Sequence, residues 1–191
     1  MLLGAAVTVA LLALACGGGD GDAAPADGHY ENKSVRYVFD YPADWGDVSD
    51  AVRLGFDAEQ PDIVDTVAVG SVEPELGLLN GVHVTVIRVK AEVTSDSLPA
   101  ELDSLNSLYE QLAAQAAGRL AEVKDVELGG LRARQYVVEF VYAGRVQAAS
   151  AQTVTFFGDR QYTVNCQGLA ETFDTEVLPG CEQVLQTFHF R

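Results

Sequence analysis

The hydrophobic positions of this chain change their spacing along its length, and each spacing predicts a different element. From Val82 to Val89, valines alternate with other residues, which is the two-residue period of a β-strand. From Leu98 to Leu120, leucine, tyrosine and alanine recur every three or four residues, which predicts an amphipathic helix. Pro99 suits the first turn of that helix, and Asp96 and Ser97 offer oxygens that can cap it.

The remaining pattern predicts strands joined by short turns and then a second helix. Runs rich in valine, tyrosine and phenylalanine alternate with Gly-containing connections, which is typical of antiparallel hairpins. The predicted strands are Val35–Tyr41, Val123–Leu128, Arg132–Ala143, Val146–Phe157 and Arg160–Cys166. Leu169–Thr187 predicts a helix with a break at Pro179–Gly180. This order of elements predicts an α+β domain in which helices cover an antiparallel sheet.

The first fifteen residues have a different character from the rest. Residues 2–15 are an apolar run without a charged side chain, and a bilayer span needs about 20 such residues. The run has the length of the hydrophobic region of a signal peptide. It ends in Ala13-Leu14-Ala15-Cys16, which resembles the lipobox cut by lipoprotein signal peptidase, although no Lys or Arg precedes it. We therefore expect residues 1–15 to be a signal peptide and Cys16 to carry the lipid.

A linker follows the cysteine directly. Residues 17–28 are mostly glycine, alanine and aspartate, so they have little side chain to pack and predict a flexible tether. We expect an acylated Cys16 and its tether over residues 16–29, and one domain over residues 30–191. Two or three acyl chains on the cysteine would hold the mature protein stably to the outer side of the cell membrane.

The charge is strongly acidic. The chain has 28 acidic and 12 basic residues, a formal net charge of −16. Such a surface repels phosphate backbones and anionic headgroups, which excludes nucleic acid as a partner and disfavours electrostatic docking to lipids. Solubility explains this acidity most simply, and attraction of cations or of a basic partner is the alternative. The acidic segment from Asp47 to Glu75 lacks the ligand spacing of a calcium loop, so we predict a solvated loop and no metal or cofactor.

Two cysteines remain after Cys16. Cys166 and Cys181 lie fifteen residues apart, and an exported protein meets an oxidising environment. A disulfide closing a loop of that size contributes roughly 3 kcal/mol. A metal pair or a reactive thiol is the alternative, but there is no Cys-x-x-Cys and only His189 lies near in sequence. We predict the disulfide.

No catalytic constellation is visible in the sequence. The three histidines are His29, in or beside the tether, His83 and His189, and nothing in the sequence brings them together. Gly-x-Ser-x-Gly, a phosphate loop and His-Glu-x-x-His are all missing, so we predict a protein that is not an enzyme. One group of aromatic residues is a candidate lining for an apolar ligand pocket, with core packing as the simpler interpretation. Its members are Tyr37, Phe39, Tyr41, Trp45, Tyr136, Phe140 and Tyr142.

Four features together resemble the PsbP-like domain of actinobacterial Lpq-type (LpqN-like) lipoproteins. They are the opening Phe39-Asp40-Tyr41-Pro42-Ala43-Asp44-Trp45, the mid-chain helix, Gly130-Leu131-Arg132-Ala133, and an ending that runs from Gln152 through Cys166 and Cys181 to Phe188. The resemblance covers nearly the whole mature chain. It implies an α-β-α sandwich around an antiparallel sheet, and a binding or assembly role without a shared catalytic set.

These observations lead to one expected function and two alternatives. We expect a lipid-anchored, non-catalytic binding or assembly module of the bacterial cell envelope, whose partner is another envelope protein. The first alternative is a carrier or sensor of a small hydrophobic ligand, which would use the aromatic group. The second is a hydrolase whose site has no recognisable motif.

Overall fold

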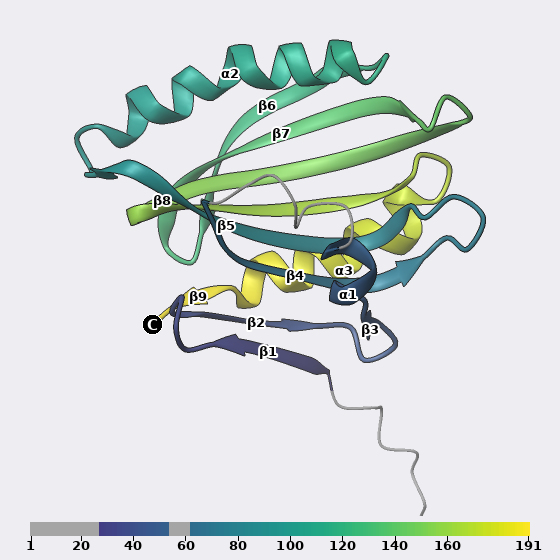
Figure 1. Cartoon of the computed structure of the whole chain (residues 1–191), viewed down its shortest axis with the longest axis horizontal. Coiled ribbons are helices and arrows are strands. Elements are labelled where there is room, and N and C mark those ends of the chain that lie inside the picture. Colours follow the sequence, from purple (N-terminus) through teal and green to yellow (C-terminus); the bar gives the residue numbers. More distant parts are fainter. Residues whose placement is uncertain (1–26, 54–61) are drawn as a thin grey trace, which may run out of the picture.

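The structure is a computed structural model that describes residues 27–53 and 62–191 (Figure 1). The predicted signal peptide, Cys16 and the tether up to residue 26 lie outside the described residues. Part of the acidic segment, residues 54–61, lies outside them as well. The described chain forms two antiparallel sheets and four helical segments.

The larger sheet holds most of the strands. Its order is β3-β4-β5-β8-β7-β6, and every neighbouring pair is antiparallel. The strands are β3 (Gly46–Asp47), β4 (Ile63–Val72), β5 (Leu79–Val93), β6 (Arg119–Leu128), β7 (Leu131–Tyr142) and β8 (Val146–Leu169). The predicted meander is therefore present, with β5 added beside its last strand.

Strand β8 folds back on itself. A straight strand of 24 residues would be about 80 Å long. Instead, the amide of Ala170 donates to the carbonyl of Gln147 over 3.0 Å, so the two ends of β8 are neighbours. The reversal falls at Gly158, whose φ of 63° is left-handed backbone that glycine adopts without strain. Its first arm pairs with β7 and its second arm with β5, as the predicted hairpin at Gly158–Asp159 requires.

The smaller sheet joins the two ends of the domain. Its order is β1-β2-β9, with β1 at Gly28–Asn32, β2 at Tyr37–Tyr41 and β9 at His189–Phe190. Regular structure among the described residues thus begins at Gly28, inside the segment 16–29 predicted as tether. His29 pairs with Asp40 across β1 and β2, so it lies in strand β1, beside the tether and not in it.

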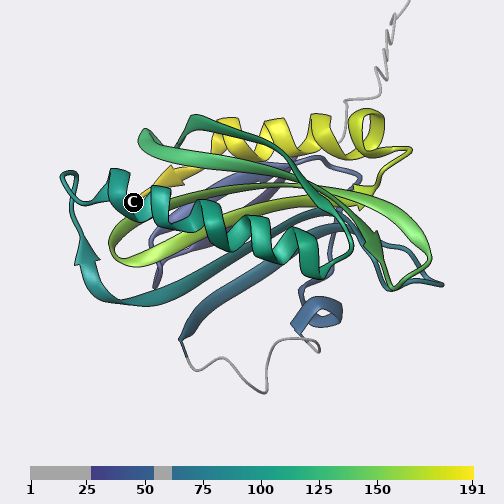
Figure 2. The same ribbon diagram turned by 90° about the horizontal axis from the view of Figure 1, so that it is seen from above.

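The helices lie on opposite faces of the larger sheet. Helix α2 (Leu98–Gln115) crosses in front of the strands in Figure 2 and contacts β6, β7 and β8. A π-helical turn, η1 (Phe173–Val177), leads into α3 (Leu178–Thr187), which packs against β2. The short helix α1 (Ser49–Arg53) lies beside β4. The fold is an α+β sandwich around an antiparallel sheet, as predicted.

Both predicted helices are too long. Helix α2 ends at Gln115 rather than Leu120, because Ala117 turns to a φ of 51° and the chain then enters β6. Gly118 permits this turn, since a side chain there would collide with the backbone of Glu139 and Phe140. At the other end, helical structure begins at Phe173.

The predicted break at Pro179–Gly180 is a helix start instead. Both residues lie in the first turn of α3, where a missing proline N–H costs nothing. Gly180 is there because Trp45 and Pro42 pack directly against its backbone.

Two hydrophobic cores lie on the two faces of the larger sheet. Alternate residues of β7 divide between them: Ala133 faces the α3 side, and Tyr136 and Val138 face α2. We call them the α3-side core and the α2-side core. The α3-side core also takes residues from β2, β4, β5, β8, η1 and α3, whereas the α2-side core is built around Leu102, Tyr109 and Ala113 of α2.

Candidate functional site

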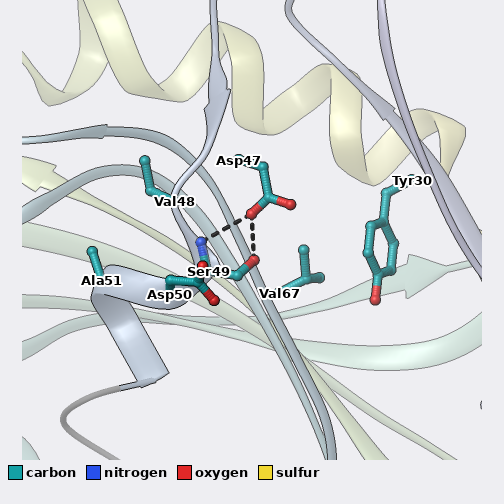
Figure 3. Close-up of a pocket in the computed structure, with 7 residues that line it drawn as sticks. All are labelled: Tyr30, Asp47, Val48, Ser49, Asp50, Ala51 and Val67. Atoms are coloured by element: carbon teal, nitrogen blue, oxygen red, sulfur yellow. Dashed lines mark hydrogen bonds between the residues drawn. The ribbon is translucent and has the colours of Figure 1, made fainter.

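A hollow of about 520 Å³ opens beside α1, where the larger sheet meets the smaller one (Figure 3). Four consecutive lining residues come from α1 and the residue before it, and the others come from β1, β3 and β4. The lining residues are Tyr30, Asp47, Val48, Ser49, Asp50, Ala51 and Val67. None of the seven aromatic residues singled out from the sequence is among them.

Hydrogen bonds hold the α1 wall of the hollow to the sheet. The Asp47 carboxylate accepts from the backbone N–H of Ser49 at 2.9 Å and from its hydroxyl at 2.6 Å, which caps the start of α1 (Figure 3). The Ser49 hydroxyl in turn accepts the amide of Ala68 in β4 at 3.0 Å. The amide of Val48 donates to the carbonyl of Ala68 at 2.9 Å. The wall is therefore built on the edge of β4.

The opposite wall is a tyrosine fixed by a carboxylate. Tyr30 and Tyr37 both donate to Oδ2 of Asp65, at 3.2 and 2.6 Å. Burial, followed by the charge of Asp65, raises the pKa of both phenols, so both remain protonated donors. Sequence reasoning singled out none of the lining residues as site residues, and it missed Tyr30 because Tyr30 stands just after the predicted tether and outside any predicted strand.

The lining of the hollow favours a ligand that combines a positive charge with an apolar part. Two aspartates lie around it, and a tyrosine ring and valine side chains supply apolar surface. A carboxylate-lined hollow with an aromatic wall attracts cations and repels anions. A lysine or arginine side chain, with an apolar stem and a charged end, has this chemistry.

A second hollow of about 330 Å³ lies at the N-terminal end of α2. Most of its lining is apolar and comes from β5, α2, the β6–β7 turn and the tip of β8. The residues are Val93, Thr94, Ser95, Leu98, Pro99, Gly130, Leu131, Arg132, Phe156 and Phe157. Its size lies at the lower end of the range of small-molecule sites.

The structure places six of the seven candidate aromatics in or against the two cores and leaves Tyr142 outside both. Tyr37 and Phe39 are buried in the α3-side core, each with its ring stacked on that of Phe188, at 5.3 and 6.3 Å between centroids. Tyr41 and Trp45 pack against the same core.

The other three lie elsewhere. Tyr136 and Phe140 belong to the α2-side core, and the hydroxyl of Tyr142 donates to the carbonyl of Gly77. The sheet thus separates the group, and its members do not surround one common cavity. Sequence alone could not separate them, because alternation shows that a strand has two faces but not which neighbour each face meets.

The predicted disulfide is confirmed. Cys166 of β8 and Cys181 of α3 are bonded, with their α-carbons 5.9 Å apart and both side chains fully buried. The bond fastens α3 to the larger sheet.

The histidines do not form a common site. His29 Nδ1 lies 2.6 Å from the Asp40 carboxylate in the smaller sheet, and His189 lies in β9. His83, in the larger sheet, is only 8% exposed, with Nε2 at 2.6 Å from the hydroxyl of Thr66 and 3.2 Å from that of Thr85. Burial lowers the pKa of His83 to about 4, so its ring is neutral near pH 7.

Within residues 27–53 and 62–191, no group of three or more histidine, cysteine or acidic side chains is placed to hold a metal ion. Nor does this part of the chain contain a helix with the length and hydropathy needed to cross a bilayer.

The fold is PsbP-like. The solution structure of cyanobacterial PsbP (CyanoP) from Synechocystis sp. PCC 6803 superimposes with a TM-score of 0.59 at 16% identity, over 90% of this chain and 96% of that one. A crystal structure of a protein from Bacteroides thetaiotaomicron VPI-5482 gives a TM-score of 0.54 at 14% identity, over 86% of this chain but only 48% of that one. The sequence matches no family model and no curated protein. At these identities the likeness concerns the fold.

Proposed function

We propose that the protein is a lipid-anchored, non-catalytic module of the bacterial cell envelope that binds or helps to assemble another envelope protein. The observation that carries this is the order of segments: an apolar signal-like run, Cys16, a Gly/Ala/Asp tether, and then a PsbP-like domain. Such a tether keeps the domain close to the membrane while leaving its surfaces accessible. The PsbP-like lipoproteins that the sequence resembles support a binding or assembly role.

The hollow beside α1 is where we propose that the partner docks. Its aspartates and the ring of Tyr30 suit a basic side chain, and a net charge of −16 would steer a basic surface toward it. The partner in this proposal is therefore a protein with an exposed lysine or arginine at its contact surface.

The anchor is tested by replacing Cys16 with Ser. The Cys16→Ser chain should leave the membrane fraction, because the thiol that would carry the acyl chains is gone. Cys166→Ser is the control, since it removes a cysteine of the folded domain and should leave membrane fractionation unchanged. Continued sedimentation of Cys16→Ser with membranes would contradict the anchor.

The docking site is tested by capture from detergent-solubilised envelope with the tagged full chain. Ala51→Arg places a cation at the hollow, and Ala114→Arg adds the same side chain to the exposed surface of α2. We expect a partner recovered by the wild type and by Ala114→Arg to be lost with Ala51→Arg. Recovery of the same proteins with all three chains would contradict docking at this hollow.

The apolar hollow at the start of α2 favours a second candidate function, a carrier or sensor of a small hydrophobic ligand. Native mass spectrometry of the protein purified from its own host should then show added mass. That mass should disappear in Val93→Trp, which would fill the hollow. A spectrum of unliganded wild-type protein would count against a carrier.

A further inference from the structure

The two edges of the larger sheet differ in how their backbone groups are paired. On one side, β4 is followed by β3, and Val48 and Ser49 bond to the backbone of Ala68. On the other side, β6 is the last strand and, within the described residues, pairs only with β7 along its ten residues (Figure 1). An edge strand with unpaired amides and carbonyls is a template for pairing with another strand.

The turn before β7 determines which backbone groups of β6 face outward. Gly129 and Gly130 both have positive φ, 58° and 79°, as a two-residue type I′ turn requires. Leu128 and Leu131, which flank this turn, are therefore a hydrogen-bonded pair, and bonded and non-bonded pairs alternate from there. By this alternation, Val123 turns its N–H and C=O away from β7, toward the open edge.

The side chains around Val123 are arranged for self-recognition. Val123 is a large apolar residue that is 41% exposed. On either side of it, Glu122 and Lys124 point to the same face of the sheet, with their charged ends 3.7 Å apart. In an antiparallel pair centred on Val123, each Glu122 would lie opposite the Lys124 of the other strand.

We propose that β6 pairs antiparallel with β6 of a second copy of this chain, around a two-fold axis at Val123. The two larger sheets then continue into one another. Val123 meets its own counterpart at the centre, with reciprocal backbone hydrogen bonds, and two Glu122–Lys124 pairs flank it. Such cross-strand pairs of opposite charge stabilise antiparallel strands.

Neighbouring two-fold registers are disfavoured by charge. An axis at Lys124 puts two lysines directly opposite each other, and an axis at Asp125 does the same with two aspartates. An axis at Glu122 opposes two glutamates. If the axis lay between two residues, residues with outward backbone N–H and C=O groups on one strand would lie opposite residues whose groups point inward on the other. No regular set of backbone hydrogen bonds could then form. The register centred on Val123 avoids all of these conflicts.

The hairpin β6–β7 also lacks the acidic excess of the chain as a whole. Its two strands carry four basic residues, Arg119, Lys124, Arg132 and Arg134, and four acidic residues, Glu122, Asp125, Glu127 and Glu139. The formal charge of the hairpin is therefore zero, in a chain whose net charge is −16. Two copies that approach through β6 therefore bring together two hairpins that each have no formal net charge.

Cross-linking of the full chain in membranes tests the register. Cys introduced by Val123→Cys should give a dimer on a non-reducing gel after oxidation with copper phenanthroline, since α-carbons of a bonded antiparallel pair lie about 5.5 Å apart. Glu127→Cys is the matched control on the same strand, because its two copies would be about 26 Å apart in this register. The wild-type chain, oxidised in the same way, is the control for cross-linking through its own cysteines.

Charge reversal tests the side-chain pairs. Adding Lys124→Glu to Val123→Cys should lower the yield of dimer about tenfold, because two attractive pairs become repulsive. Adding Glu122→Lys as well should restore it. All three side chains are exposed, and an unchanged melting temperature verifies that each variant folds.

The proposal is overturned if Val123→Cys gives no more dimer than Glu127→Cys. It is equally overturned if Lys124→Glu leaves the yield unchanged, or if the double reversal fails to restore it. These readouts are independent of docking at the hollow beside α1.

Discussion

The two faces of the larger sheet are closed by different means. On the α3 side, residues from both ends of the domain meet, and an aromatic stack of Tyr37, Phe39 and Phe188 is reinforced by the disulfide. On the α2 side, one helix follows directly from β5 and covers a smaller core.

The α2 face also uses polar links. The hydroxyl of Tyr136 donates to the carbonyl of Leu102, and Arg134, only 10% exposed, bonds to Asp103 of α2 and Asp125 of β6. Hydrogen bonds from Arg134 and Arg132 keep the pKa of Asp125 below its usual value. Long-range packing thus closes one face of the sheet, whereas a local helix with a few fixed polar contacts closes the other.

The largest expected effect comes from emptying the α3-side core. Phe39→Ala should lower the free energy of unfolding by about 3–5 kcal/mol, because it removes a buried ring from the stack. Chemical denaturation measures it. Phe157→Ala, at a ring that is 41% exposed, is the control and should cost much less. Equal losses would contradict the placement of Phe39 in the core.

His83 should make stability depend on pH. Its pKa is about 4 in the fold and about 6.5 when unfolded, so the unfolded chain binds the extra proton between these values. The contribution of His83 to the free energy of unfolding is complete above pH 6.5. It is lost as the pH falls toward 4, and the loss is about 3 kcal/mol in total. His83→Gln should remove this part of the pH dependence, and His29→Gln should leave it. If the free energy of unfolding changed with pH in the same way for the wild type and for His83→Gln, the predicted role of His83 would be refuted.

Breaking the covalent link of the α3 side should cost roughly 3 kcal/mol by the loop-entropy estimate. The double variant Cys166→Ser with Cys181→Ser avoids a lone thiol. Its melting temperature should match that of the reduced wild type, and a reductant should not lower it further. An unchanged melting temperature relative to the oxidised wild type would show that the bond does not stabilise the fold.

The smallest effect is expected on the α2 side. Tyr109→Phe removes only the hydroxyl that donates to Gln152 at 3.1 Å, and keeps the ring stacked on Tyr136 at 3.9 Å. The loss should be about 1 kcal/mol, measured by denaturation. A loss as large as that of Phe39→Ala would mean that the α2 face depends on this bond far more than its geometry indicates.

Local features of the fold could be predicted from the sequence, and contacts between distant segments could not. The period of α2 and the hairpin at Gly158 follow from neighbouring residues. The early end of α2 depends also on the approach of Gly118 to the backbone of β7, a contact between segments about twenty residues apart. The hollow was missed for the same reason, since Tyr30 and α1 come together only through the arrangement of the two sheets.

By itself, the sequence determined the two main helical segments, the hairpins, the disulfide partners and the acidic charge, because each depends on residue spacing or on a simple count. It did not determine β3, α1 and β4, which lie in the acidic segment predicted as a solvated loop. Tertiary structure alone decided that Tyr37 and Tyr136 lie on opposite faces, that β9 pairs with β2, and that β6 is the last strand of the larger sheet. The physical reason is that strand pairing and burial are settled between segments far apart in the chain. A two-residue period marks two faces of a strand without specifying what each face will contact.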